Sequence, residues 1–269
     1  IDTGLREGRA NIAFDQAMID AHVAGDIPDA IRFLRFPSPA LIGRHQAISE
    51  EIHLDYCQEN NIGIVRRITG GGAIYFDRDQ LGWELVFSRT TLGISTLPEL
   101  TQAICEAAAA GLRKLGVDAQ FRPRNDIEVD GRKLCGTGGF FDGSTLFYQG
   151  TLLINLDAAK MISALKVPAQ KLAKRDLESA GQRIVTLHEL LDGKIPPISE
   201  IQAAMLEGFA ERLNIKPVWG EATAFEEEQA QTNFDDEIGT EEFVFEIDKP
   251  DVGDNIHQAT YSGTGGTVK

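Results

Sequence analysis

Two arginines stand just before a run of three glycines in this chain, separated from it by two residues. Arg66 and Arg67 precede Gly70, Gly71 and Gly72, and a short apolar segment then predicts a strand. Glycines lack a Cβ, so their backbone N–H groups can come close to a ligand. Guanidinium groups pair with phosphate or carboxylate oxygens. The segment therefore predicts a site for a small anion, although three consecutive glycines are also common in a simple loop.

The glycine run differs from two common nucleotide-binding motifs. No Gly-Lys-Ser/Thr follows it, so it is not a Walker A loop. A strand is predicted after it, whereas a dinucleotide-binding fingerprint requires a helix there.

A lysine after a predicted hairpin turn is the second candidate. Asn125 and Asp126 precede a short apolar run, Gly131 and Arg132 return the chain, and Lys133 follows, in a glycine-rich segment. An amine beside glycines suits an anionic ligand. The alternative is an exposed lysine of a surface hairpin, because most lysines are exposed.

A glycine within a predicted strand is the third candidate. Gly150 follows Gln149 and precedes Thr151 in an otherwise apolar run. Such a glycine often marks the close approach of a ligand or of another backbone, and a simple bulge is the alternative.

Both helices and strands are needed to bring these candidates together. Apolar spacing predicts helices over 9–24, 49–61, 97–115, 157–165, 186–191 and 199–213, and Thr96, Pro98 and Gly116 mark the ends of the third. Apolar runs predict strands over 30–43, 62–67, 73–76, 82–88, 119–121, 127–129 and 146–156, the last of them broken by Gly150. The irregular mixture, with hairpin-like strand pairs, favours an α+β fold.

The composition narrows the partners and the compartment. The chain has 269 residues and a formal net charge of −15, so it would repel nucleic acid. It has three cysteines at irregular spacing, which favours a reducing cytoplasm over a disulfide framework. We expect no membrane span, because no apolar run is long enough. The chain does not begin with Met, and we expect part of the native start to be missing.

The three candidate segments together resemble one family. The order Arg-Arg-x-Thr-Gly-Gly-Gly-Ala, Asn-Asp-Ile, Gly-Arg-Lys-x-x-Gly-Thr and Gly-Thr-Leu-Leu is similar to that of the biotin/lipoate ligase superfamily, and within it to the lipoate–protein ligase A family. The segments 11–15, 34–36, 42–46, 171–173 and 183–187 fit the same pattern, so the resemblance covers about residues 9–215. It implies an α+β catalytic domain like those of class II synthetases and biotin ligases, with a mixed, mostly antiparallel sheet flanked by helices.

The resemblance also implies an activity and a set of site residues. Members of the family use ATP and Mg²⁺ to convert lipoate to lipoyl-AMP, and then transfer the lipoyl group to a lysine of a lipoyl carrier domain. Lys133 is the implied catalytic residue, and Asp126 is the implied metal ligand. The implied ATP- or adenylate-binding residues are Arg67, Gly71, Gly72, Ala73, Ile74, Tyr75, Asn125, Asp126 and Lys133. The implied lipoate-binding residues are Arg67, Gly70, Gly71, Gly72, Lys133, Gly136, Gly150 and Thr151.

Two other functions are weighed against this one. Octanoyl or lipoyl transferases of the same fold use a cysteine thioester, at a position near Leu146 in one group and near Gln120 in another. Neither position is a cysteine, and Cys135 matches neither group. The other alternative is a non-catalytic module that binds a lipoylated partner, and the retained lysine and glycines disfavour it. The family usually has histidines where Phe76 and Gln149 stand here, which affects the polarity of the pocket.

The last part of the chain is predicted to differ from the rest. We expect a catalytic domain over 1–220, an acidic linker or edge segment over 221–258, and the start of an incomplete accessory unit over 259–269. The acidic run is either a solvated surface or a surface that faces a partner. We further expect residues 134–145 to form a mobile loop that closes over the adenylate, and a separate subunit or a lost tail to complete the enzyme.

Overall fold

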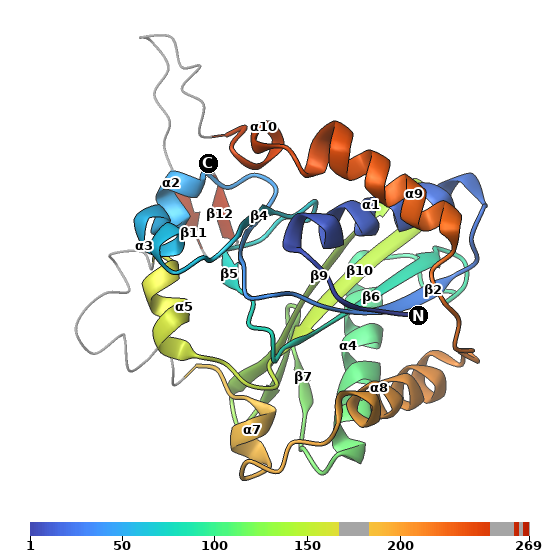
Figure 1. The fold of residues 1–269 in the computed structure, drawn as a ribbon. Coiled ribbons are helices and arrows are strands. Elements are labelled where there is room, and N and C mark those ends of the chain that lie inside the picture. Colours follow the sequence, from blue (N-terminus) through green and yellow to red (C-terminus); the bar gives the residue numbers. More distant parts are fainter. Residues whose placement is uncertain (167–182, 248–260, 264–265, 269) are drawn as a thin grey trace.

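A seven-stranded sheet forms the centre of the molecule (Figure 1). The computed structural model describes residues 1–166, 183–247, 261–263 and 266–268. In spatial order the strands are β1 (Asp2–Leu5), β2 (Ala30–Arg35), β6 (Leu81–Ser88), β10 (Thr145–Leu152), β9 (Arg132–Asp142), β8 (Asp126–Val129) and β7 (Gln120–Arg122). Only the β1–β2 pair is parallel among these neighbours, which confirms the expected mixed, mostly antiparallel sheet.

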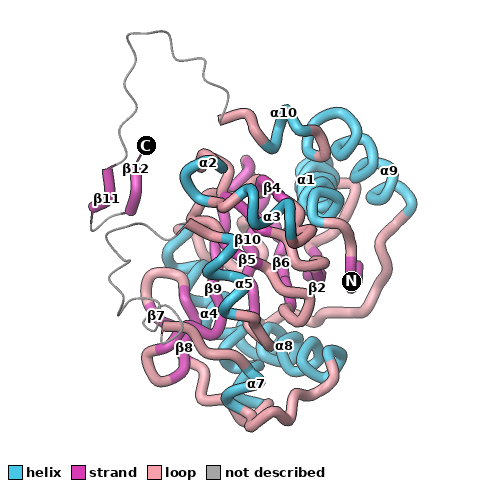
Figure 2. Tube along the Cα trace, turned by 60° about the vertical axis from the view of Figure 1, so that its left-hand side comes forward, coloured by secondary structure: helices cyan, strands magenta, loops and turns pink. Residues whose placement is uncertain are grey.

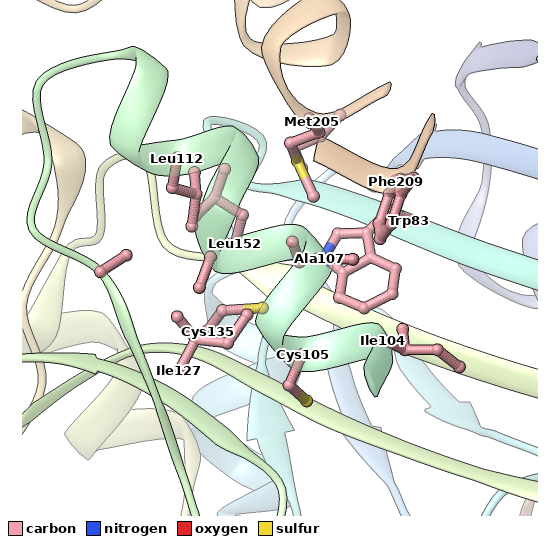
Figure 3. Close-up of a cluster of buried hydrophobic side chains, with 14 of the residues drawn as sticks. Trp83, Ile104, Cys105, Ala107, Leu112, Ile127, Cys135, Leu152, Met205 and Phe209 are labelled. Carbon is pink, nitrogen blue, oxygen red and sulfur yellow. The ribbon is translucent and has the colours of Figure 1, made fainter. Parts of the chain in front are cut away.

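Helices cover both faces of this sheet. Figures 1 and 2 show α4 (Leu97–Lys114) and α8 (Ile198–Leu213) on one face, and α1 (Gly8–Ala24) and α9 (Ala224–Asn233) on the other. The alternation along β6 explains this arrangement, because Trp83 and Leu85 join the core under α4 and α8 whereas Val86 packs with α1. Figure 3 shows the Trp83 side of this core, where Phe209 of α8 lies against the indole.

The two longest helices have the ends that the sequence predicts. The Thr96 side chain accepts a hydrogen bond from the backbone N–H of Glu99, so it caps α4 as expected. Gly116 follows α4 with a φ of +84°, a conformation that favours glycine. The predicted helix over 9–24 corresponds to α1 within one residue.

A smaller three-stranded sheet carries the glycine run. Its order is β4 (Ile64–Arg66), β3 (Ala40–Ile42) and β5 (Ile74–Tyr75), and the glycines connect β4 to β5. The short helices α2 (Ile48–Glu51), α3 (Leu54–Glu59) and α5 (Ala158–Ala164) complete this side of the molecule, whereas α7 (Leu187–Leu190) packs on the core of the large sheet. The single helix expected over 49–61 is therefore two helices.

Two expectations about the central hairpin are wrong. Residues 134–145 do not form a loop, because β9 extends to Asp142 and pairs with β10 from Cys135 to Asp142. Gly150 does not break β10, which runs continuously through it and pairs with β6 and β9. A Cβ at Gly150 would lie 2.2 Å from the Trp83 ring, so this glycine makes room for a fully buried indole.

The described part of the acidic segment is helical. After α9, a π-helical turn (Phe234–Ile238) and α10 (Glu241–Val244) continue along α1 (Figure 1). Ion pairs join Arg6 to Glu227 and Arg9 to Glu241. The helical part of this segment thus packs against α1, and the expected boundaries at residues 220 and 258 stay predictions.

Two arginines connect the last described helix to the loop that follows β3 of the small sheet. The guanidinium of Arg66, which is fully buried, donates to the backbone carbonyls of Phe243 and Val244 and to those of residues 43, 44 and 46. Arg44 pairs with Glu246. Segments that are far apart in sequence are therefore fastened together beside the glycine run.

Near the C-terminus, β11 (Tyr261–Gly263) and β12 (Gly266–Val268) form an antiparallel pair, and the segment 171–173 of the family pattern lies outside the described residues. Within the described ranges, none of the helices has the length and apolar character that crossing a membrane requires.

A charged cluster is buried between α1 and the sheet. Arg32 donates to Asp15 at 2.5 Å and to Glu84 at 3.0 Å, and each of the three side chains is at most 2% exposed. Its other terminal nitrogen donates to Asn11 at 2.6 Å. Two carboxylates against one guanidinium leave an excess negative charge, so burial and the neighbouring Asp15 raise the pKa of Glu84 well above its usual range.

We expect the free energy of unfolding to fall less steeply with rising pH in Glu84→Gln than in the unmodified protein. A raised pKa means that, above about pH 4.5, the native state keeps a proton that the unfolded chain has released. The free energy of unfolding therefore falls as pH rises, by up to about 1.4 kcal/mol per pH unit, until the native group also ionises. Glutamine resembles the protonated form and does not titrate. Urea unfolding at pH 5 to 8 should show a smaller decline in the variant.

The control for this prediction is Glu106→Gln on the exposed face of α4. This variant should decline with pH as the unmodified protein does. If the free energy of unfolding declined equally with pH in the unmodified protein and in both variants, Glu84 and Asp15 would hold no extra proton in the native state.

Candidate functional site

The three sequence candidates meet in one cavity of about 540 Å³. The glycine run and β5 form one wall, the β9–β10 hairpin forms a second, and α5 with the chain around Ile184 forms a third. The cavity is lined by Arg67, Thr69, Gly70, Gly71, Gly72, Ala73, Ile74, Tyr75, Gln80, Asn125, Lys133, Gly136, Thr137, Gly138, Gly139, Phe140, Gln149, Gly150, Thr151, Leu153, Leu156, Met161, Leu165 and Ile184.

A bulge in β9 directs Lys133 into this cavity. The β8–β9 register pairs Ile127 with Cys135 but Glu128 with Lys133, so one extra residue, Leu134, lies between them on β9. The Nζ of Lys133 lies 2.8 Å from Oδ1 of Asp126. The backbone of Lys133 also pairs with the segment at Arg183 and Val185, which fixes the strand at this point.

The ion pair between Lys133 and Asp126 occupies the space beside Gly136 where a side chain would otherwise lie. It pairs directly with Asp126 across the two strands. A Cβ at position 136 would lie 2.6 Å from both Cε and Nζ of Lys133. The absence of a side chain at this position therefore leaves room for the lysine to reach the carboxylate.

We expect Gly136→Ala to lower the activity of the site strongly without unfolding the protein. The added methyl meets only the flexible end of Lys133, which can swing away at little cost in stability. The amine then loses its position, and a displacement of about 1 Å can cost about 100-fold in rate. The two measurements are the melting temperature and the rate of acyl-adenylate formation, which is the activity that the family resemblance implies.

A double-mutant cycle supplies the control for Gly136→Ala. In a Lys133→Ala background there is no amine to displace, so the glycine substitution should add little. Additive losses in the double variant would show that the methyl acts on some other part of the site.

Arg67 presents a buried cation to the cavity. Its guanidinium donates to the carbonyls of Gly70 and Gly72 at 2.9 Å and 2.8 Å, and these bonds fold the glycine run around the side chain. Its Nη1 is buried without a hydrogen-bond partner in the part of the chain that the structure describes. Burial lowers the pKa of Arg67 to about 10, so the group is still cationic at neutral pH. This arrangement suits a carboxylate or phosphate oxygen.

Gly43 holds the glycine run close to the small sheet. A Cβ at this position would lie 2.1 Å from the carbonyl oxygen of Gly71, and Gly71 itself has a φ of +103°. The N–H of Arg44 donates to the carbonyl of Thr69 at 2.9 Å. The Nε2 of Gln149, on β10, donates to the Thr69 hydroxyl at 2.7 Å and ties the run to the central sheet.

The cavity has a narrow end and a wide end. At the narrow end it continues into a smaller cavity of about 30 Å³, whose walls include Leu34, Phe36, Phe76 and Trp83 and the carboxyls of Asp15 and Glu84. Phe76 packs on Phe36 with ring centroids 4.5 Å apart, so one of the two departures from the family pattern makes this end more apolar. The wide end is lined by Leu153, Leu156, Met161, Leu165 and Ile184.

All three cysteines of the chain lie in described segments, and none of them lines the cavity. Each is at most 1% exposed. Burial raises the pKa of the Cys135 thiol to about 12 and also raises that of Cys105. A buried thiol with a raised pKa is a poor nucleophile.

The structure brings the predicted site residues together. Every predicted binding residue lines the cavity except Asp126, which contacts it through Lys133. Within the described ranges no group of three or more His, Cys, Asp or Glu side chains is arranged to hold a metal ion. Sequence reasoning missed Gln80 and the apolar wall at 153–165 as parts of the site. In sequence, the apolar residues cannot be distinguished from ordinary core residues. A single glutamine before a strand likewise has no feature that marks it as part of a binding site.

A family model for the lipoyl protein ligase A/B catalytic domain matches residues 7–210. The chain belongs to this family. Lipoate-protein ligase A subunit 1 of Thermoplasma acidophilum is 30% identical to it in an alignment of 245 residues that covers 87% of this chain and 91% of that protein. The octanoyltransferase LipM of Kyrpidia tusciae is 29% identical and covers 86% of this chain and 92% of its own.

Solved structures of family members have the same fold. The bipartite lipoate protein ligase of T. acidophilum, described with its E2 lipoyl domain, superposes with a TM-score of 0.80 at 28% identity, covering 93% of this chain and 98% of that one. A lipoate-protein ligase A bound with ATP gives 0.75 at 27% identity, with 90% and 96% coverage. Membership of the family supports an enzyme that acts in lipoyl attachment, and the two kinds of relative leave ligase and transferase chemistry to be distinguished.

Proposed function

We propose that this chain is an ATP-dependent lipoate–protein ligase. The observation that carries the proposal is a cavity that contains two cationic side chains, Lys133 and Arg67, and no thiol. An acyl carboxylate and a phosphate both need such cations. A transferase that works through a thioester needs a cysteine in the cavity, and none is available there.

In the first proposed step, a lipoate carboxylate oxygen attacks the α-phosphorus of ATP. A P–O bond forms, the bond to the leaving β-phosphate breaks, and lipoyl-AMP and pyrophosphate result. Negative charge gathers on the α-phosphate oxygens, where Lys133 and the unpartnered Nη1 of Arg67 would stabilise it. The backbone N–H groups of the glycine run would add further donors.

In the second proposed step, the amine of a carrier lysine attacks the acyl carbonyl. A C–N bond forms, the C–O bond to the phosphate breaks, and AMP leaves with its electron pair. The attacking amine must first lose a proton, because the reference pKa of lysine is about 10.4. The leaving AMP phosphate would remain paired with Lys133 during this step.

The narrow end of the cavity suits the acyl tail. Its walls are mainly apolar side chains from α1, β2 and the start of β6, and Gly150 and Thr151 connect this end to the centre of the cavity. A carboxylate at Lys133 and Arg67 would leave the tail pointing toward Phe36 and Phe76. Two chains of similar length, lipoate and octanoate, would therefore compete.

Mg²⁺ fits the proposal in a limited way. Asp126 is the carboxylate nearest to the amine of Lys133, and a magnesium ion in such sites typically uses one or two carboxylates together with substrate phosphates. When bound, the ion would neutralise part of the triphosphate charge. Asp126 would be its protein ligand in competition with Lys133.

The proposed partner is a lipoyl carrier domain that provides the acceptor lysine. The solved bipartite relative supports this proposal, and it also supports a separate accessory subunit for the chain. Three free, buried thiols agree with a reducing compartment, so we retain the cytoplasm as the proposed location.

The test combines two measurements on the purified chain. Incubation with Mg²⁺, ATP and lipoic acid should give lipoyl-AMP and pyrophosphate, detected by mass spectrometry. Incubation with an octanoylated carrier protein and no ATP should leave the intact mass of the chain unchanged. A mass increase of one octanoyl group, without adenylate in the first reaction, would replace the ligase proposal with the transferase one.

A further inference from the structure

Two hydroxyl groups connect the core of the large sheet to the wall of the cavity. Tyr148 of β10 is fully buried, and its hydroxyl lies 2.5 Å from Oγ1 of Thr137 on β9. The Thr137 hydroxyl in turn donates to the backbone carbonyl of Asn125 at 2.8 Å. Thr137 and Asn125 line the cavity, whereas Tyr148 does not. Consecutive hydrogen bonds thus join a core residue to two residues of the cavity wall.

The donors in this network have a defined order. A hydroxyl has a single proton, and Thr137 uses its own for the carbonyl of Asn125, so Tyr148 must donate to Thr137. The phenol oxygen is then left to accept from α4, where the Cys105 thiol lies 3.5 Å away. Burial raises the pKa of both Tyr148 and Cys105, so both groups keep the protons that this order requires.

A glycine gives the Tyr148 ring the space to reach Thr137. Gly139 pairs with Tyr148 across β9 and β10, and a Cβ at position 139 would lie 2.6 Å from Cδ2 of the ring. The ring therefore lies over this glycine. Thr137 comes two residues earlier on β9, so its side chain is on the same face of the sheet. The missing side chain at position 139 lets the phenol hydroxyl come within bonding distance.

Asn125 is fastened to Thr137 through its backbone and its side chain. Its carbonyl accepts from the backbone N–H of Thr137 at 3.0 Å as well as from the hydroxyl. Its side-chain Nδ2 donates to the Thr137 carbonyl. Asn125 itself is exposed in the short segment between β7 and β8, next to Asp126, the partner of Lys133. Displacement of Thr137 would therefore move Asn125 relative to this ion pair.

We propose that the buried pair of Tyr148 and Thr137 positions Asn125 for contact with the nucleotide. This inference rests on the proposed use of ATP and on Asn125 as a nucleotide-binding residue. Tyr148 and Thr137 act through Asn125, so they are positioning residues. A buried network in which each group is bonded favours one geometry. None of the three residues lines the narrow end of the cavity, so the effect should be confined to the nucleotide.

The test uses substitutions that remove or keep single hydroxyls in the full chain. Thr137→Val and Tyr148→Phe each remove one hydroxyl, and Thr137→Ser keeps it. Thr145→Val is the matched control, because Thr145 is a buried threonine of the same hairpin that bonds His22 and does not line the cavity. Calorimetric titrations with ATP and, separately, with lipoic acid give the two affinities. The melting temperature of each variant is measured in parallel.

The expected result is a selective loss of ATP affinity. Thr137→Val should bind ATP about tenfold more weakly and Tyr148→Phe about threefold, which is the range of one hydrogen bond. Thr137→Ser and Thr145→Val should stay within about twofold of the unmodified chain, and no variant should lose affinity for lipoic acid. The double variant should bind ATP no more weakly than Thr137→Val, because the phenol acts through the Thr137 hydroxyl.

The other outcomes separate this inference from the ligase proposal. Equal losses for ATP and lipoic acid, or additive losses in the double variant, would show a general effect on the sheet and overturn the inference. Unchanged ATP affinity in Thr137→Val, with lipoyl-AMP formed by the unmodified chain, would overturn it and leave the ligase proposal intact. A selective loss in a chain that forms no lipoyl-AMP would do the reverse. An unmodified chain that does not bind ATP would overturn both.

A folding failure does not prevent this decision. If the melting curve shows that Thr137→Val is unfolded, Tyr148→Phe decides, because it removes one oxygen atom and leaves the ring in place. Its ATP affinity should then fall about threefold while its affinity for lipoic acid is kept. An unchanged ATP affinity in this variant would overturn the inference.

Discussion

Lys133→Ala should lower the rate of lipoyl-AMP formation by about 100- to 1,000-fold. Removing one preorganised donor from the site of developing charge typically has an effect of this size. The amine is held beside Asp126 by the β9 bulge and is half-exposed in the cavity, so its loss leaves no buried unpaired group. The melting temperature should change little. Pyrophosphate release under saturating ATP and lipoate is the measurement.

Arg132→Ala is the matched control for this substitution. Arg132 is the neighbouring cation on β9, and it pairs with Glu189 outside the cavity. Its removal should leave the rate within about twofold, because exposed ion pairs contribute little. If both variants lost activity equally, the effect would come from the strand and not from the amine of Lys133. A fully active Lys133→Ala would exclude the proposed role.

Gly43→Ala should lower activity by about 100-fold, because it displaces the neighbouring glycine run. The new Cβ would meet a backbone oxygen at 2.1 Å, and a backbone cannot rotate away as a side chain can. Gly71 or the β3 end must move by about 1 Å, which displaces the N–H groups and the carbonyls that hold Arg67. We also expect a loss of about 1–3 kcal/mol in the free energy of unfolding, as for overpacked sites.

Gly63→Ala provides the control in the same small sheet. A Cβ there would meet only Pro39 at 4.0 Å, an ordinary contact, and the backbone is not in the left-handed region. This variant should keep its activity and its melting temperature. Loss of stability without loss of activity in Gly43→Ala would contradict the proposed role of the loop position.

Local signals explain which elements were predictable. Helix α4 has a threonine cap, an early proline and a terminal glycine, all of them within a few residues of its ends. The β9–β10 hairpin has no such signal in its first strand, where glycines at 136, 138 and 139 disfavour a strand. Its pairing with β10 supplies the stability, and that pairing is visible only in three dimensions.

Site residues were predictable from the sequence where they belong to motifs of unusual residue types. They were not predictable where their role depends on how strands and side chains pack in three dimensions. The glycine run, Asn125 and Lys133 are unusual enough in sequence to be identified, and they meet in the cavity. Gln80 differs from other glutamines only in its burial, which results from its position next to Leu153 at the end of two paired strands. The role of Gly150 was also hidden, because its need for glycine comes from Trp83 on the neighbouring strand.

The contacts of Arg66 and Arg44 with residues 243–246 matter for engineering this chain. These contacts connect α10 to the loop that carries Gly43, and that loop touches Gly71. A truncation before residue 241 would remove two of the five backbone carbonyls that accept hydrogen bonds from the buried Arg66 guanidinium, those of Phe243 and Val244, beside the candidate site. Conversely, a binding domain inserted between α9 and α10 could displace α10 when its ligand binds. Through Arg66 and Arg44 this displacement would reach the loop at Gly43 and then the glycine run, and we would expect the catalytic rate to change.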